Sequence, residues 1–388
     1  MRGSDKEQQD FSLSYPLEDM IKESLYKIKN KLKTKNKTYY TRSDEMERIG
    51  VLTGGGDCPG INPVIRGVVR AALADSKYEI IGLLNGWQGM LAKEYIKLDL
   101  DSVSGILHRG GTILGTSRTN PYKKEGGPAK CIQNFKELKL DALVAIGGED
   151  TLGVANKLHK EGLNIVGVPK TIDNDLSATD FTFGFDTAVN VAMEAIDRLH
   201  TTAESHHRIM VVEVMGRHAG WIAVYAGIAG GADVILIPEI PVDINAVVNI
   251  LQNRKKRGRN FSIVVVAEGA KFKDDSLVIQ EEKLDAFGHV RLGGIGQILS
   301  DQIEKITGFE TRVTVLGHIQ RGGSPTASDR VLGTRFGVEA VRLIEKKKFG
   351  RMVSLSGVNI IDVPLEKAVG KLKTVDMGIY DVAKLFFG

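Results

Sequence analysis

Short, unbroken runs of Val, Ile and Leu are the feature of this 388-residue sequence that most limits its fold. Each run ends in glycine or polar residues, and stretches with helical spacing separate the runs. Continuous apolar runs suit strands buried on both faces, and such strands occur in parallel sheets covered by helices. The runs are IGVLT (49–53), EIIGLL (79–84), ALVAIGG (142–148), IVGVP (165–169), IMVVEVMG (209–216), VILIPE (234–239), SIVVVAEG (262–269) and VTVLGHIQRGG (313–323). The sequence therefore predicts an α/β fold with mainly parallel sheets.

The charge and composition of the chain argue against nucleic-acid and membrane partners. The net charge of +4 is too small to indicate a nucleic-acid partner. No apolar run approaches the roughly 18 residues that span a bilayer, and the start of the chain lacks the apolar core of a signal peptide. Two cysteines, Cys58 and Cys131, do not make a disulfide framework. We therefore expect a cytoplasmic protein with no nucleic-acid or membrane partner.

The first 48 residues differ from the rest because they are rich in charge and poor in glycine. Seven lysines lie between positions 22 and 37, and apolar residues recur there at helical spacing: Ile21, Leu25, Ile28 and Leu32. We expect an N-terminal extension, 1–48, with a basic amphipathic helix that packs on the body of the protein or on a neighbouring subunit. A role at a membrane surface is the less favoured alternative.

Polar and charged residues follow the predicted strands. In parallel sheets, ligands bind beyond the carboxyl ends of the strands. The residues there are Gly54–Asp57, Glu149–Thr151, Lys170–Asp175, Met215–Arg217, Glu268 and His318–Arg321. Glycines allow close approach, arginines bind phosphate, and carboxylates hold metals or move protons. This repertoire favours phosphate chemistry at one edge of the sheets.

Two segments carry the most specific chemistry. In PKTIDNDLSATDFTFGFDTA (169–188), Asp173 and Asp175 lie two apart, so in an extended segment both face one side. One could then hold a metal or orient the other as a general base, although a turn that only ends the strand is the alternative. Arg217 follows Gly216, and we expect it at the start of a helix, where an anion is favoured.

Five motifs together resemble the phosphofructokinases, which phosphorylate fructose 6-phosphate at its 1-hydroxyl. They are GVLTGGGDCPGINPVIRGVVR, RGGTILGTSR, PKTIDNDL, VVEVMGRHAG and VTVLGHIQRGGSPTASDR, and they occur in the family's order between about Ile49 and Lys373. The resemblance implies two Rossmann-like three-layer domains with the active site in the cleft between them. Residues 49–184 plus about 320–370 would bind the phosphoryl donor, and residues 185–319 plus about 371–388 would bind fructose 6-phosphate.

The resemblance also implies roles for matching residues. Asp173 would be the general base for the sugar hydroxyl, supported by Asp175, and Arg217 would stabilise the transition state. The remaining catalytic contact, to the transferring phosphoryl group, would come from Thr171. The sugar phosphate would be bound by Met215, Gly216, Glu268, His318 and Arg321, together with Arg208 and Arg312 from a neighbouring subunit. The donor would be bound by Gly55, Arg118, Asp150 and Lys170, and Mg²⁺ by Glu149 and Asp175. We therefore expect a homo-oligomer, a dimer or a tetramer, that works in glycolysis or gluconeogenesis.

The donor is decided by Asp150 and Lys170. Family members that use ATP have glycine at one or both of these positions, and pyrophosphate-dependent members resemble this sequence at both. An aspartate here would occupy the space of a nucleotide's α-phosphate, and Lys170 could offset its charge while binding a small anion. We therefore expect a reversible diphosphate-dependent 6-phosphofructokinase.

Three alternatives remain. The first is an ATP-dependent 6-phosphofructokinase. The second is a lipid or NAD kinase, which would lack TIDND and HIQRGG. The third is a non-catalytic regulatory or nucleotide-sensing subunit, which would have no need to keep Thr171, Asp173 and Arg217.

Overall fold

All eight apolar runs form strands in the computed structural model, which describes residues 47–74, 77–273 and 293–388. These strands are β1 (Glu47–Thr53), β2 (Tyr78–Leu83), β4 (Ala142–Gly147), β5 (Ile165–Pro169), β6 (Ile209–Val214), β7 (Val234–Leu236), β8 (Ser262–Ala267) and β9 (Thr311–Val315). The last is shorter than its apolar run, because the chain turns into a 3-10 helix, η3, at Gly317–Arg321. The expected N-terminal helix lies outside the described residues.

The strands belong to two sheets. One has seven strands in the order β11-β10-β5-β4-β1-β2-β3, and the other has four in the order β7-β8-β6-β9. Neighbours within the four-stranded sheet are parallel, and so are β10, β5, β4, β1 and β2 in the larger one. Three strands were not predicted: β3 (Tyr95–Leu98), β10 (Arg351–Ser356) and β11 (Asn359–Pro364). Since β3 and β11 pair antiparallel at the two edges, the seven-stranded sheet is mixed.

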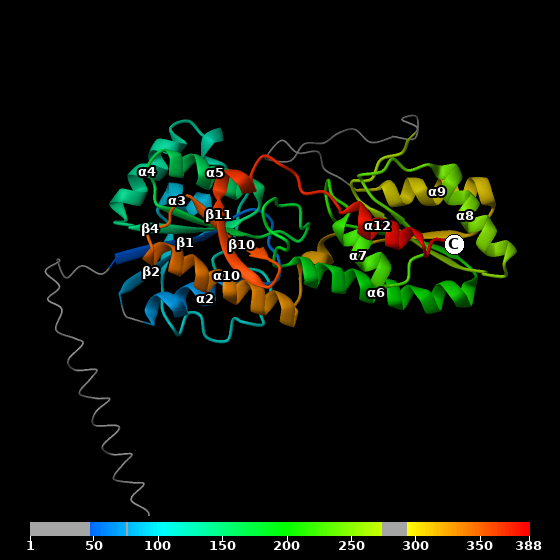
Figure 1. Cartoon of the computed structure of the whole chain (residues 1–388), viewed down its shortest axis with the longest axis horizontal. Coiled ribbons are helices and arrows are strands. Elements are labelled where there is room, and N and C mark those ends of the chain that lie inside the picture. The colour runs from blue at the N-terminus through cyan, green and yellow to red at the C-terminus, as the bar shows by residue number, and fades with distance from the viewer. Residues whose placement is uncertain (1–46, 75–76, 274–292) are drawn as a thin grey trace, which may run out of the picture. The chain divides into compact units, whose positions relative to one another are not determined.

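Helices cover both faces of each sheet. Around the seven-stranded sheet lie α2 (Ile61–Leu73), α3 (Trp87–Ala92), α4 (Gly127–Glu137), α5 (Glu149–Lys160), α10 (Ala327–Glu345) and α11 (Leu365–Ala368), with a short 3-10 helix at Pro121–Lys123. Around the four-stranded sheet lie α6 (Phe185–His206), α7 (Trp221–Ala229), α8 (Ile244–Lys256), α9 (Ile295–Thr307) and α12 (Met377–Lys384). In Figure 1, α2 and α10 lie on one face of the larger sheet and α4 and α5 on the other. The architecture confirms the predicted α/β class with three-layer sheets.

The burial pattern explains these layers. Alternate residues of one strand enter different clusters: Val51 of β1 packs toward α2 and α10, whereas Leu52 packs toward α3 and α4. In β6, Val212 joins the same cluster as Val51, and Val211 joins a third cluster with α8 and α9. One hydrophobic core therefore runs without interruption from the larger sheet to the smaller one. It passes through α6 and α10, whose residues belong to it.

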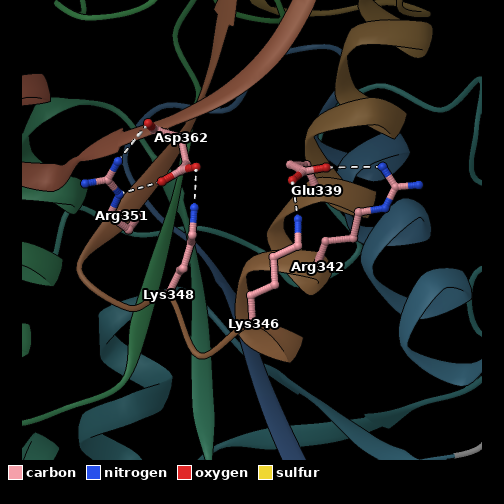
Figure 2. A network of polar contacts seen from close by, with 6 residues as sticks. All are labelled: Glu339, Arg342, Lys346, Lys348, Arg351 and Asp362. Carbon is pink, nitrogen blue, oxygen red and sulfur yellow. Dashed lines mark hydrogen bonds and ion pairs between the residues drawn. The ribbon is translucent and has the colours of Figure 1, made fainter.

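The hairpin of β10 and β11 is fastened to the chain that precedes it by surface ion pairs (Figure 2). Asp362 of β11 accepts a hydrogen bond from Lys348 at 3.2 Å and from the Nε of Arg351 at 2.6 Å. On α10, Glu339 pairs with Arg342 at 3.2 Å and with Lys346 at 4.0 Å. The contacts of Asp362 join β11 to β10 and to the chain before it, whereas those of Glu339 stay on α10 and the residue that follows it. Each exposed pair contributes only about 0–1 kcal/mol.

Among the described residues, no helix is both long and apolar enough to cross a membrane. Both cysteines, Cys58 and Cys131, are buried free thiols.

Candidate active site

The predicted site residues follow adjacent parallel strands. In the larger sheet β1, β4 and β5 are neighbours, so the turns that follow them lie side by side. In the smaller sheet β8, β6 and β9 are neighbours, and their turns meet in the same way. A contact joins the two groups: the Nη1 of Arg321, after β9, donates to the carbonyl of Asp57, after β1, at 3.3 Å. The carboxyl ends of both sheets therefore form one site.

The glycine turn, Gly54–Gly56, lies at the centre of the donor side. Gly55 has φ +81°, a conformation that glycine adopts without a Cβ penalty. A Cβ on Gly54 would lie 2.6 Å from the hydroxyl of Thr151, and one on Gly56 would lie 2.5 Å from Nη1 of Arg321. Real Cβ contacts are longer than this, so a side chain at position 54 would displace Thr151, whereas at position 56 the flexible end of Arg321 could shift. The first turn of α5, which contains Thr151, thus lies against the glycine turn.

Lys170 is buried, and its Nζ donates to the carbonyl of Gly56 at 2.5 Å. Burial lowers the pKa of Lys170, while Asp173 and Asp57 oppose that shift. Its ammonium therefore also binds the backbone of the glycine turn, a contact that was not predicted beside its expected roles of offsetting Asp150 and binding the phosphoryl donor.

The start of α5 presents two acids. Gly148 is the N-cap and supplies no side-chain cap, and Glu149 and Asp150 form the first turn. Negative side chains are favoured at this end of a helix, where the backbone N–H groups are unpaired. Glu149 Oε1 also accepts a hydrogen bond from the backbone of Gly370 at 3.0 Å. Asp150 is half-buried.

The base turn, residues 170–175, follows β5. The backbone N–H of Asp173 donates to the hydroxyl of Thr171 at 3.0 Å. Asn174 has φ +51°, so the segment is not extended, and the expectation that Asp173 and Asp175 face one side as in a strand is wrong. The left-handed residue between them turns the chain, yet the two acids still interact. Burial and the charge of Asp173 raise the pKa of Asp175 to about 7.

Asp173 has the environment of a proton acceptor. It is only 4% exposed, and its Oδ1 has no hydrogen-bond partner among the described residues. A buried acceptor without a partner costs free energy unless a ligand satisfies it. The orphaned oxygen therefore suits a substrate hydroxyl.

The arginine turn, residues 215–217, follows β6. Gly216 has φ +141° and Arg217 has φ +45°, and the turn closes when Ala219 N–H donates to Gly216 O at 2.9 Å. Arg217 is therefore not at the start of a helix, because α7 begins four residues later, at Trp221. Arg217 instead lies in the turn itself, with a left-handed backbone.

Two other strand ends fix the arginine turn. The backbone N–H of Met215 donates to Oε1 of Gln320 at 2.8 Å, and that of Arg217 donates to Oε1 of Glu268 at 3.3 Å. Gln320 is fully buried and lies inside HIQRGG, but its role was not predicted from the sequence. Burial, followed by the charge of Asp173, raises the pKa of Glu268 to about 7. The charge of Asp173, in the base turn of the other sheet, thus contributes to the raised pKa of Glu268.

His318 in η3 and Arg118 are exposed. Arg118 follows Ser117, whose carbonyl accepts a hydrogen bond from the backbone N–H of Gly55 in the glycine turn at 3.1 Å.

Two predicted arginines lie farther from this centre. Arg208 precedes β6 and Arg312 lies at the start of β9, which is the opposite end of the sheet from the arginine turn. Both pair with Glu310, at 2.7 and 2.5 Å. Because a six-residue strand spans about 20 Å, these arginines do not join the site of their own chain.

The acids of the site fit a divalent cation that arrives with phosphate. No cluster of three or more His, Cys, Asp or Glu side chains able to hold a metal occurs in the described part of the chain. However, Asp173 and Glu149 both raise the pKa of Asp175, and Arg217 is the cation that opposes them there. Excess negative charge with few protein ligands suits Mg²⁺, which binds one or two carboxylates plus substrate phosphates and water.

Comparison with known proteins shows which family this chain resembles. The family model described as "Phosphofructokinase" matches residues 48–344. The "Pyrophosphate--fructose 6-phosphate 1-phosphotransferase" of Streptomyces coelicolor is 57% identical over 342 residues, which cover 88% of this chain and 100% of that protein. The "ATP-dependent 6-phosphofructokinase 3" of the same organism is 53% identical, over 87% of this chain and 99% of that protein. The crystal structure of Pichia pastoris phosphofructokinase in the T-state is 31% identical with a TM-score of 0.75, and the match covers 90% of this chain and 37% of that one.

Proposed function

The chain belongs to the phosphofructokinase family, and we propose that it transfers a phosphoryl group reversibly from pyrophosphate to the 1-hydroxyl of fructose 6-phosphate. The products are fructose 1,6-bisphosphate and phosphate. The observation that carries the choice of donor is the carboxylate of Asp150 in the first turn of α5, beside the glycine turn.

Asp173 is the general base of this proposal. Its Oδ1, which has no hydrogen-bond partner in the described part of the chain, accepts the proton of the sugar 1-hydroxyl as the hydroxyl oxygen forms its bond to phosphorus. The bridging P–O bond of pyrophosphate breaks in line, and its electron pair leaves with the departing phosphate. Thr171 lies beside the base, and its hydroxyl already accepts the Asp173 N–H, so its own proton is available to the phosphoryl group.

Arg217 supplies positive charge to the transferring group. Arginine binds phosphate through two parallel N–H donors, which suits the spread of charge over the equatorial oxygens. The other sugar contacts in the proposal are Met215, Gly216, Glu268, His318 and Arg321. Catalysis consists of positioning and charge stabilisation, without a phosphoenzyme.

Glu149 and Asp175 are the residues proposed to hold Mg²⁺. The ion would neutralise the phosphate oxygens and polarise the phosphorus centre when it arrives with pyrophosphate. Meanwhile the backbone bond from Gly370 keeps Glu149 in place.

Asp150 selects the donor by occupying space. Thr151 in the same turn lies against Gly54, so a donor held by the glycine turn lies next to Asp150. An inorganic diphosphate fits beside that carboxylate, whereas a nucleotide would have to extend its α-phosphate and adenosine past it. The acid also places negative charge where the helix would otherwise attract the α-phosphate. Gly55, Arg118 and Lys170 complete the proposed donor site.

A second copy of the chain completes the sugar site in this proposal. Arg208 and Arg312 lie together at the amino ends of β6 and β9, where they can face a neighbour. A homo-oligomer would let each subunit lend these two cations to the 6-phosphate of the next. The proposal assigns donor binding to residues 49–184 plus about 320–370, and sugar binding to 185–319 plus about 371–388. It places the enzyme in the cytoplasm, where its two free thiols stay reduced.

The test compares pyrophosphate and ATP as donors for the wild type and for Asp150→Gly. The wild type should use pyrophosphate and use ATP poorly. Asp150→Gly should raise kcat/KM for ATP at least about tenfold and lower that for pyrophosphate, because the missing side chain opens the nucleotide path. Coupled assays with Mg²⁺ and each donor measure both values.

The matched control is Asp150→Asn, which keeps the side-chain volume and removes the charge. If crowding excludes the nucleotide, this variant stays poor with ATP; if charge alone excludes it, ATP use rises. An unchanged donor preference in Asp150→Gly would contradict the role of this residue. A wild type that prefers ATP would contradict the proposed donor.

A further inference from the structure

We propose that Lys373 is a positioning residue that fixes where the base turn lies relative to the arginine turn. The inference rests on the proposed function, because the proposed function assigns Asp173 and Arg217 to the same phosphoryl-transfer step. Lys373 lies in the segment between α11 and α12, about 200 residues after the base turn.

The ammonium of Lys373 uses three donors on the base turn and the loop that follows it. Its Nζ donates to Oδ1 of Asn174 at 3.2 Å, to the carbonyl of Thr179 at 2.9 Å and to the carbonyl of Asp180 at 2.5 Å. Its backbone N–H donates to the carbonyl of Asp175 at 2.9 Å. An ammonium has three protons, so this one is fully engaged. One residue therefore binds Asn174, between the two acids, the backbone of Asp175, and the loop that follows.

Lys373 affects the position of Asp173 through its hydrogen bond to Asn174. Asn174 lies between the two acids with φ +51°, a conformation that non-glycine residues keep only when their surroundings impose it. Its Oδ1 accepts from Lys373 and also from the backbone of Thr182 at 3.2 Å. Without the ammonium, one bond would remain on this oxygen, the Thr179 carbonyl would lose the Lys373 donor, and the Asp180 carbonyl would keep the long bond from Nδ2 of Asn174 at 3.5 Å. The direction of Asp173 would then be less well fixed.

The other side of Lys373 contacts the helix that follows the arginine turn. The indole Nε1 of Trp221 donates to the carbonyl of Lys373 at 2.9 Å, and the Lys373 Nζ lies 5.0 Å from the centre of the Trp221 ring. Trp221 is the first residue of α7, four residues after Arg217. Two residues later, the N–H of Val375 donates to Glu239 at 2.9 Å, and Glu239 also accepts from the N–H of Gly220 at 3.1 Å. One short segment thus binds the base turn and the start of α7.

This arrangement predicts a role in turnover more than in substrate affinity. In the proposed reaction Lys373 touches no reacting atom, and its effect passes through Asn174 and Trp221. Misplacing a catalytic group by 1 Å can cost about 10²-fold in rate. Loss of the ammonium should therefore lower kcat, while the phosphate contacts that set KM remain.

The experiment compares Lys373→Met with Lys371→Met. Methionine keeps the length and the apolar stem of Lys373 and removes its three donors. Lys371 is exposed in the same segment and serves as the matched control. We expect kcat of Lys373→Met to fall about 10- to 100-fold, with KM for fructose 6-phosphate and pyrophosphate within about threefold of the wild type. Lys371→Met should match the wild type.

A second comparison separates positioning from a general structural role. If Lys373 acts by aiming Asp173, then Lys373→Met should cost less than about threefold in an Asp173→Asn background, where the base is already lost. An equal cost in both backgrounds would overturn the inference, and so would a wild-type kcat in Lys373→Met or a loss confined to KM.

Lys373→Arg keeps the inference testable if the methionine variant fails to fold. A guanidinium keeps the charge but cannot direct three protons at the same three oxygens, so kcat should fall with KM preserved. Wild-type kcat in this variant would overturn the proposal. All variants are assayed with pyrophosphate and with ATP. A wild type that turned over only ATP would contradict the proposed donor, and the Lys373 ratios would still be measured with that donor.

Discussion

The base turn after β5 and the arginine turn after β6 occupy equivalent positions on their sheets, yet they are held in different ways. The base turn is held through one side chain: Oδ1 of Asn174 accepts from the Lys373 ammonium and from the Thr182 backbone N–H, and Oδ1 of Asp173 has no partner among the described residues. The arginine turn is held through its backbone: the N–H groups of Met215 and Arg217 donate to the side chains of Gln320 and Glu268, and φ is positive at Gly216 and Arg217. A buried base has to be aimed by its surroundings, whereas a long arginine can reach its target if the turn directs it outward.

The largest effect should come from removing the base itself. Asp173→Ala should lower kcat by about 10²–10⁴-fold, the usual contribution of general base catalysis, with smaller changes in KM. Steady-state kinetics with pyrophosphate measure this loss. Asp173→Asn is the control because it keeps the size of the side chain and should lose a similar factor. A loss below tenfold would mean that another group accepts the proton.

The next effect tests the backbone of the arginine turn. Gly216→Ala would place a Cβ 2.7 Å from the carbonyl of Ala219, at φ +141°. The turn would have to shift, and a 1 Å displacement of Arg217 would lower kcat/KM about 100-fold. The control is Gly153→Ala, in the interior of α5, where nothing lies within 4 Å of the added Cβ. This control should stay active and gain up to about 1 kcal/mol of stability. Full activity of Gly216→Ala would show that turn shape does not direct the arginine.

The smallest effect is the pH dependence of the free energy of unfolding that Glu268 contributes. Burial raises the pKa of Glu268 to about 7, so the folded protein holds a proton that the unfolded chain has released above about pH 4.5. The free energy of unfolding of the wild type, relative to Glu268→Gln, should therefore fall as pH rises from about 4.5 to 7. Partial exposure limits the change to about 1–2 kcal/mol.

Denaturant unfolding of the wild type and Glu268→Gln at several pH values checks this. A difference that rises over the same window would show that the folded state favours the charged carboxylate. A third protein, Asp173→Asn, sharpens the comparison. Since Asp173 contributes to the raised pKa, its removal should reduce the pH dependence.

Much of the site could be predicted because its residues lie where the sequence pattern is clearest. Continuous apolar runs indicated the eight buried parallel strands, and Asp173, Arg217 and Glu268 follow three of them directly. The strands that were missed have weaker patterns. In β11, exposed and half-buried residues alternate, and Ile361 is 42% exposed, so the segment does not resemble a strand buried on both faces. The edge strand β3 is exposed at three of its four positions.

Other features depend on contacts that no local pattern encodes. The left-handed backbone of Asn174 and Arg217 follows from their surroundings, so the sequence predicted an extended segment and a helix start instead. Lys373 is a single lysine in a polar segment, and only the fold brings it to Asn174. The pairing of Arg208 and Arg312 with Glu310 likewise needed the register of β6 with β9.

The uninterrupted core through α6 and α10 restricts how such a chain can be rebuilt. The half around the four-stranded sheet cannot be exchanged for an unrelated module by cutting at the crossings, because α6 and α10 pack their apolar sides into a shared interior. A recombinant hybrid would need matching partners for both helices. Because the two halves share this packing, they should be inherited together even if catalysis did not require both.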